Sequence, residues 1–219
     1  KLLIFSTFGK VYSIQSFELP DGNLQSRGKS IVNLLPLKKD EYISSILPLP
    51  VEEKEWKNLN IVFSTTKGMI RKNKLIDVAK SGQRNLRESG KLAISLNKED
   101  SLIDVKICEN ESDVLISTTD GNCIRFPIEK IRLISGLNSK GVRGIRLKKK
   151  NTVISMSILS HSPIDINIRK DYLKYAANSR KGKKIEQKNE NLEKLIGKEE
   201  FILSVTTRGY AKRSSAYEY

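Results

Sequence analysis

Residues 61–72 read Ile61-Val62-Phe63-Ser64-Thr65-Thr66-Lys67-Gly68-Met69-Ile70-Arg71-Lys72, and the same plan recurs three more times along the chain. Each copy is an apolar, β-branched run, then T-x-G, then a second alternating run. This order predicts a β-hairpin in which the glycine supplies a turn residue of positive φ. The other copies lie at residues 3–12, 114–125 and 201–213. Self-similarity of this kind indicates a repeat architecture.

Two further markers follow the hairpin in each of the first three repeats. The first marker is a segment that opens with glycine, at residues 28–34, 90–96 and 141–147. The second marker is a short run at residues 42–46, 102–106 and 153–157. These runs alternate between apolar and polar side chains, which is typical of half-buried strands.

The spacing of the repeats predicts the architecture. The hairpin glycines are Gly9, Gly68, Gly121 and Gly209. The first two intervals are close to the ~50 residues and about four strands of a propeller blade. We therefore expect an all-β fold of β-propeller-like repeats with a short helical insertion at about residues 161–199, where residues 171–176 and 191–196 are the predicted helices. The expected organisation is one repeat domain over residues 1–219, with blade-like repeats at 1–59, 60–112 and 113–199 and the start of a further repeat at 200–219.

The net charge of the chain is +15, from 40 Lys and Arg against 25 Asp and Glu. Such an excess favours a polyanionic partner, chiefly nucleic acid. Lysine is much commoner than arginine, and Asn and Ile are abundant, as in proteins from A·T-rich genomes. Genome composition could therefore produce part of the positive charge, and the arrangement of the charges is the better evidence for nucleic-acid binding. The insertion holds ten basic and six acidic residues, and the repeats carry most of the excess.

Several classes of protein are excluded by residue types that are scarce. Cys108, Cys123 and His161 are too few for a His/Cys zinc site, and His161 has no nucleophile partner for a triad. We expect Cys123 to be a small core residue and Cys108 a reduced thiol, which fits a cytoplasmic protein. No apolar run approaches the ~20 residues of a membrane helix, and no secretory signal precedes the first strand.

The repeats resemble a known family, the C-terminal domain of the A-type subunit of bacterial DNA gyrase. Residues 30–37 and 141–147 resemble segments typical of that family, and residues 212–219 resemble the opening of a later blade there. The resemblance implies a β-pinwheel, a six-bladed, propeller-like disc in which neighbouring blades exchange strands and duplex DNA wraps around a basic rim. It also implies a role in the ATP-dependent negative supercoiling that the A-type and B-type subunits of gyrase perform together.

The chain departs from the family in two ways. The Q-R-R-G-G-x-G heptapeptide is missing, and residues 25–29 are only a partial echo of it. The chain also begins inside a strand and ends just after entering a fourth repeat, so we expect a fragment of roughly three and a half blades. The family's cleavage and ATPase domains are absent from it. We expect no cofactor here, since the parent enzyme would use ATP and Mg²⁺ through other domains.

The candidate DNA-binding residues are basic and recur with the repeats. The loop before each glycine-led marker is basic, and its glycines let the backbone approach a phosphate closely. Repetition would give a continuous positive track that bends duplex without reading sequence. The loops contribute Arg27, Lys29, Arg84, Arg87, Lys91, Lys140, Arg143 and Arg146. The second hairpin strands add Lys72, Arg125, Lys212 and Arg213.

Two points about these candidates stay open in the sequence. Side chains alternate along a strand, so Lys72 should share a face with the apolar Ile70 unless a bulge intervenes. The run Lys148–Lys150 is either a DNA contact or a solubilising loop. Few aromatic side chains lie outside strand patterns, which favours duplex over single-strand binding.

Three alternatives to a gyrase module remain. The A-type subunit of topoisomerase IV has a C-terminal domain with the same repeats. A propeller can also serve as a scaffold for protein partners, because fold does not determine function. An independent enzyme is the least favoured, since no acid and base recur in a motif.

Overall fold

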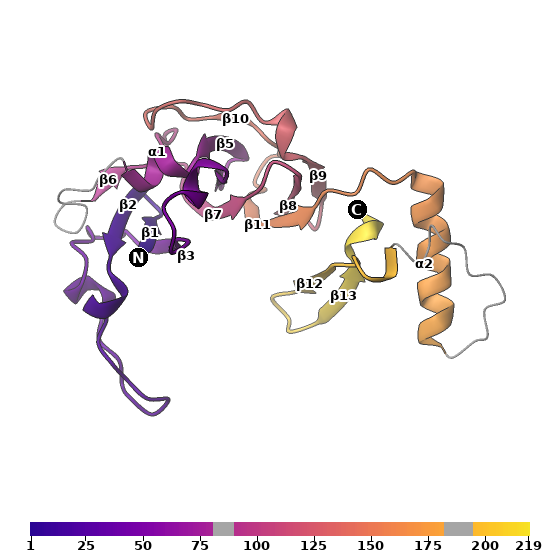
Figure 1. The fold of residues 1–219 in the computed structure, drawn as a ribbon, viewed down its shortest axis with the longest axis horizontal. Coiled ribbons are helices and arrows are strands. Elements are labelled where there is room, and N and C mark those ends of the chain that lie inside the picture. The colour runs from indigo at the N-terminus through magenta and orange to yellow at the C-terminus, as the bar shows by residue number, and fades with distance from the viewer. Residues whose placement is uncertain (81–89, 182–194) are drawn as a thin grey trace. The chain divides into compact units, whose positions relative to one another are not determined.

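The computed structural model describes residues 1–80, 90–181 and 195–219 (Figure 1). These residues form two compact units, unit 1 at Lys1–Ile158 and unit 2 at Leu159–Tyr219. No helix within the described ranges is long and apolar enough to cross a membrane.

Unit 1 contains three sheets that follow one another along the chain (Figure 1). The first sheet has the order β3 (Ile43–Pro48), β1 (Leu2–Ser6), β2 (Lys10–Ile14) and β6 (Lys91–Leu92). The second has the order β10 (Val142–Arg143), β5 (Met69–Lys74), β4 (Asn60–Thr65) and β7 (Leu102–Cys108). The third has the order β11 (Val153–Ser160), β8 (Ser112–Thr118) and β9 (Cys123–Pro127). The short helices are η1 (Ser16–Glu18), η2 (Ile31–Asn33), η3 (Glu55–Lys57), α1 (Leu75–Lys80) and η4 (Ile128–Lys130).

The glycine-led markers of the second and third repeats supply an edge strand to the preceding sheet. β6 pairs with β2, and β10 pairs with β5. The hairpin glycine is the point of attachment in both cases: Ala93 N–H donates to Gly9 O at 2.8 Å, and Gly144 N–H donates to Gly68 O at 2.9 Å. The first two sheets are therefore complete only when the next repeat is folded. The marker at residues 28–34 forms no strand and contains η2 instead.

The four hairpin glycines share a positive φ but differ in their surroundings. A Cβ on Gly68 would lie 2.8 Å from Ile145 O, and one on Gly9 would lie 2.5 Å from Ile94 O. A Cβ on Gly121, whose φ is +79°, would meet nothing within 4 Å. Only the first two glycines must therefore be small to admit the incoming strand.

Gly68→Ala should lower the free energy of unfolding more than Gly121→Ala. Both changes put a side chain at positive φ, which costs roughly 1–2 kcal/mol. Gly68→Ala adds overpacking against the backbone of residue 145, which costs a further ~1–3 kcal/mol. Urea unfolding of the two variants measures the difference, and equal midpoints would show that the strand does not dock there.

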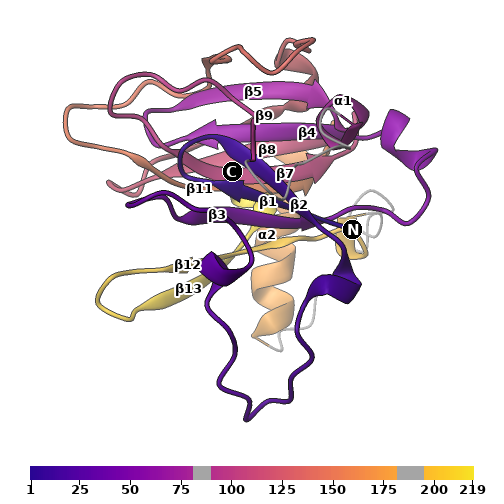
Figure 2. The ribbon, with the colours of Figure 1, turned by 90° about the vertical axis from the view of Figure 1, so that its left-hand side faces the viewer.

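The core lies between the sheets, which pack face against face (Figure 2). Ile61 and Phe63 of β4 face the first sheet, where Phe63 meets Phe5 edge-on with ring centroids 5.7 Å apart. Val62 packs on the other side with the third sheet. All six residues of β4 are buried, as expected for a central strand with both faces covered.

The repeats are also tied together through the T-x-G threonines. Leu102 N–H donates to Thr7 O at 3.0 Å, and Val153 N–H donates to Thr66 O at 2.9 Å. The first two hairpin turns therefore each hold the first residue of the next repeat's alternating strand. This second contact fixes the stacking distance and register of neighbouring sheets.

Unit 2 contains helix α2 (Ile166–Arg180), the hairpin of β12 (Phe201–Val205) and β13 (Ala211–Ser215), and η5 (Ala216–Glu218). Asp165 caps α2 by accepting from Asn167 N–H at 2.7 Å. The helix predicted at 171–176 is thus confirmed and is longer than expected. The one predicted at 191–196 falls mostly outside the described residues. Cys123 is exposed rather than part of the core, because no strand covers that face of β9 among the described residues, and Cys108 is buried.

Candidate nucleic-acid interface

Two kinds of turn gather at one end of the sheets of unit 1, which we call the glycine-turn end. Each T-x-G hairpin turn lies beside the turn that precedes the alternating strand of its own repeat. The bonds between them run from Thr7 N–H to Tyr42 O, from Thr66 N–H to Ser101 O and from Thr119 N–H to Thr152 O, at 2.8, 2.8 and 2.9 Å. Loops of all three repeats are therefore presented at this end.

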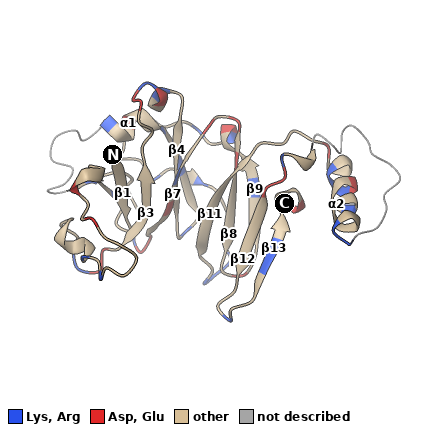
Figure 3. Cartoon of the chain, turned by 60° about the horizontal axis from the view of Figure 1, so that its bottom comes forward, with Lys and Arg blue, Asp and Glu red and all other residues tan. Residues whose placement is uncertain are grey.

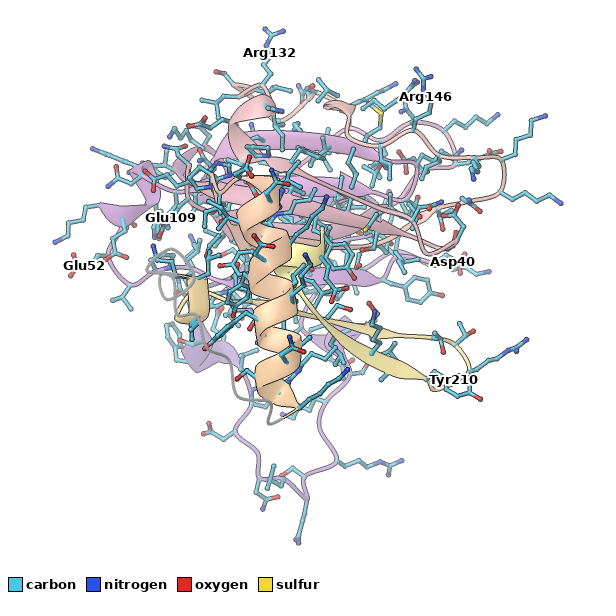
Figure 4. All side chains as sticks on the ribbon, turned by 90° about the vertical axis from the view of Figure 1, so that its right-hand side faces the viewer. Asp40, Glu52, Glu109, Arg132, Arg146 and Tyr210 are labelled. Carbon is cyan, nitrogen blue, oxygen red and sulfur yellow. The ribbon has the colours of Figure 1, made fainter. Side chains whose placement is uncertain are left out.

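The two ends of unit 1 differ in charge. Arg146 and Asp40 lie at the glycine-turn end, whereas Glu52 and Glu109 lie at the opposite end (Figure 4). The opposite end carries the exposed carboxylates of Glu52, Glu53, Glu55, Glu109 and Glu111 together with the exposed lysines Lys54, Lys57, Lys80 and Lys130. Exposed charges of both signs therefore lie at that end, where Lys54 pairs with Glu52 and Lys80 with Glu53, and they largely offset one another.

The largest run of uncompensated positive charge is Lys140–Lys150, which we call the third basic segment. It holds six cations and no carboxylate in 11 residues. All six are exposed: Lys140, Arg143, Arg146, Lys148, Lys149 and Lys150. The corresponding residues 89–100 hold two cations and two carboxylates, and residues 27–41 hold four cations and two carboxylates. Positive charge is thus concentrated in the third repeat.

The carboxylates of the first two repeats have structural tasks. Glu41 accepts from Tyr12 Oη at 3.0 Å and from Lys38 N–H at 2.9 Å. Burial raises its pKa, but hydrogen bonds from Ser6, Lys38 N–H and Tyr12 outweigh burial and hold the pKa below its ordinary value. Asp100 likewise accepts from the hydroxyls of two hairpin threonines. The third repeat has Asn151 at the corresponding position, and its hairpin threonine Thr118 donates instead to Asp120 within the turn.

The third basic segment is held in place by a buried arginine. Arg71 of β5 is fully buried, and its Nη1 donates to Leu137 O and Ser139 O at 2.9 Å each. Its Nη2 donates to Ala93 O, and its guanidinium lies 4.6 Å from the ring centroid of Phe63. Burial lowers the pKa of Arg71 to about 10, so the side chain stays charged at neutral pH. One side chain therefore joins segments of the second and third repeats.

Asn73 extends this clamp along β5. Its Nδ2 donates to Ile134 O at 2.6 Å and to Gly136 O at 3.0 Å. Ile134 N–H in turn donates to Lys72 O at 2.9 Å. The loop at residues 134–139, just before the third basic segment, is thus held by bonds to three consecutive residues of β5.

The structure places the predicted loop cations on the surface. The exposed ones are Arg27, Lys29, Lys91, Lys140, Arg143 and Arg146. The last three lie together in the third basic segment, whereas Lys91 belongs to the edge strand of the first sheet and Arg27 and Lys29 to the loop before η2. Arg84 and Arg87 lie outside the described residues.

Two of the predicted DNA contacts are instead internal. Lys72 is buried between the second and third sheets, and its Nζ donates to Ile128 O at 2.8 Å. It shares the face of Ile70, as the two-residue period requires. The Arg125 side chain is only 8% exposed and its Nε lies 2.8 Å from the Asp113 carboxylate, itself 7% exposed. Neither cation is available to DNA, and we leave both out of the proposed interface.

Lys212 and Arg213 lie on β13 in unit 2 and are exposed (Figure 3). Lys212 Nζ is 3.8 Å from a Glu218 carboxylate oxygen, and the Arg213 guanidinium lies 4.6 Å from the ring centroid of Phe201. Both side chains are exposed, and surface ion pairs of this kind contribute little to stability.

Comparison with models of known protein families shows to which family the chain belongs. The family model described as "DNA gyrase C-terminal domain, beta-propeller" matches residues 1–50, 84–109, 112–160 and 200–219, more than half of the chain. The chain belongs to the DNA gyrase C-terminal domain family. The predicted resemblance is confirmed.

Relatives support the same assignment. The chain is 42% identical to the DNA gyrase A protein of Rickettsia bellii over its whole length and 36% identical to that of Escherichia coli over 72% of its length. The chain spans about a quarter (25%) of the length of the Rickettsia bellii relative.

Solved structures confirm the all-β, propeller-like fold. The C-terminal domain of DNA topoisomerase IV matches with a TM-score of 0.69 and 22% identity over 100% of this chain and 54% of that one. A DNA gyrase A C-terminal domain matches with a TM-score of 0.56 and 22% identity over 72% of this chain and 47% of that one. The two domains share this fold, and the family model and the curated relatives are those of gyrase.

Proposed function

We propose that the chain is a non-catalytic module of the A-type subunit of DNA gyrase that binds duplex DNA by its phosphate backbone. The observation that carries the proposal is the third basic segment, with six exposed cations and no carboxylate, which follows a loop anchored by Arg71 and Asn73. Because the preceding loop is already anchored, the cost of ordering on binding would fall chiefly on the side chains, at about 0.5–1.5 kcal/mol each.

The proposed partner is duplex rather than single-stranded. Trp56, the only tryptophan, is buried, and its Nε1 donates to Pro50 O at 3.0 Å. No aromatic side chain falls within the third basic segment, where a stacking platform for bases would be needed. Contacts to phosphates alone carry no sequence information, so binding should be largely independent of sequence.

Within the parent enzyme, the module would bend or wrap duplex DNA along its basic segments and so support ATP-dependent negative supercoiling. Its partners there would be the rest of its own gyrase polypeptide and the B-type subunit. ATP and Mg²⁺ would act through other domains, and the site of action would be the cytoplasmic nucleoid. The fold match to topoisomerase IV keeps the A-type subunit of that enzyme as the nearest alternative parent.

Binding should weaken steeply with salt. Each phosphate contact adds about 0.9 to the slope of log affinity against log salt, so five to six contacts predict a slope of roughly −5. Fluorescence anisotropy with two 40-base-pair duplexes of different sequence measures the slope and the sequence dependence. Binding no tighter than that of an unrelated protein of similar charge would reject the proposal and favour a scaffold for protein partners.

A further inference from the structure

We infer that the exposed face of α2 is a second phosphate-binding surface for duplex DNA, an inference that rests on the proposed function. The helix lies in the stretch between residues 160 and 200, which the family model does not match. The surface would therefore be an addition to the repeats.

Three lysines form a stripe along this face. Lys170 and Lys174 of α2 and Lys181, the C-cap residue that follows it, are exposed, and at 100° per residue they fall within about 40° of one another around the helix axis. At 1.5 Å per residue the stripe is about 16 Å long. Tyr172 points to the opposite side, where it is buried with its ring centroid 5.3 Å from that of Tyr217.

The two arginines of the helix, Arg169 and Arg180, hold it against the rest of unit 2. The Arg180 guanidinium lies 2.9 Å from a Glu199 carboxylate oxygen, and Tyr172 Oη donates to the same carboxylate at 2.9 Å. Arg169 Nη1 donates to Tyr219 O at 3.2 Å. The helix is therefore docked through one face, and the three lysines of the stripe are exposed.

The stripe is not explained by stability of the helix. Lys170 and Lys174 are one turn apart, and like charges at this spacing destabilise a helix by about 0.2–0.5 kcal/mol. Asp171 is the single carboxylate within α2, and its pair with Lys174 at 3.6 Å is exposed and weak (Figure 3). A bound phosphate backbone would relieve the repulsion between the lysines.

The test compares two triple variants of the full chain that remove the same charge. K170Q/K174Q/K181Q should lower affinity for a 40-base-pair duplex at 100 mM salt roughly 10- to 100-fold and make the salt slope shallower by about 2–3. Glutamine matches lysine in helix propensity, so α2 should persist, as circular dichroism can check. The control K54Q/K57Q/K80Q changes exposed lysines near the end of unit 1 opposite the glycine turns and should change affinity less than twofold.

The outcomes separate the two proposals. A helix variant that binds as the wild type does, or a control that weakens equally, would overturn the inference while the proposed function stands. Failure of the wild type to bind duplex would instead reject the proposed function. A photo-crosslinker on K174C, with K57C as control and Cys123→Ser in both, reports contact without relying on affinity. DNA adducts at position 174 and none at 57 are expected.

Discussion

Loss of charge from the third basic segment should lower affinity for duplex DNA roughly 1000-fold at 100 mM salt. The variant R146Q/K148Q/K149Q/K150Q removes four cations outside strand β10 and leaves every described hydrogen bond of Arg71 in place. The loss of about four phosphate contacts should also make the salt slope shallower by 3–4. Anisotropy titration measures both quantities.

The control for this variant removes four cations elsewhere. K54Q/K57Q/K80Q/K130Q has the same net charge, and all four lysines are exposed and lie away from the glycine-turn end. It should bind within about threefold of the wild type, because charges beyond a Debye length of ~10 Å are largely screened. Equal losses in the two variants would mean that only bulk charge matters and that the segment is not the interface.

Arg71→Met should lower the free energy of unfolding by about 3–5 kcal/mol. The change removes the donor of the Ala93 and Leu137 carbonyls, whereas Ser139 O keeps the bond from Ser95 N–H at 3.2 Å, and a buried acceptor without a partner costs roughly 1–3 kcal/mol. Urea unfolding measures the loss, and hydrogen exchange should show faster opening of residues 134–146. The affinity for DNA should also fall, because the loop that precedes the third basic segment would be less ordered and would hold the cations less firmly in place.

Arg71→Lys is the matched control for this change. Lysine keeps the charge but not the planar fork, so it can serve fewer of the three carbonyls. We expect an intermediate stability and partial recovery of exchange protection. If Arg71→Met were as stable as the wild type, the arginine would not be the clamp that the contacts indicate.

Local patterns in the sequence predicted much of this fold because they report local geometry. T-x-G between alternating runs requires a tight turn of positive φ, and the turns at Gly9, Gly68, Gly121 and Gly209 have it. β6 and β10 could not be located in this way, since each is two residues long. Their pairing depends on a hairpin in the preceding repeat, which is a tertiary contact.

The charged strand residues show where residue type misleads. Lysine is seldom buried, which favoured a surface position for Lys72, although the two-residue period placed it beside Ile70. The period was the better guide, because Ile128 offers its carbonyl to the ammonium. The repeat motif contains Arg71, but its structural role was not predicted. The feature of the sequence that could have indicated this role is a cation next to Ile70, in a strand whose pattern is otherwise that of a central strand.

The most direct test of the central claim is lysine footprinting of the free and DNA-bound chain. Acetylation rates, read by mass spectrometry, compare each lysine with itself and need no substitution. We predict strong protection of Lys140, Lys148, Lys149 and Lys150 by a 40-base-pair duplex, and unchanged rates at Lys54, Lys57 and Lys80. Equal protection at both sets, or none in the third basic segment, would contradict the proposed interface.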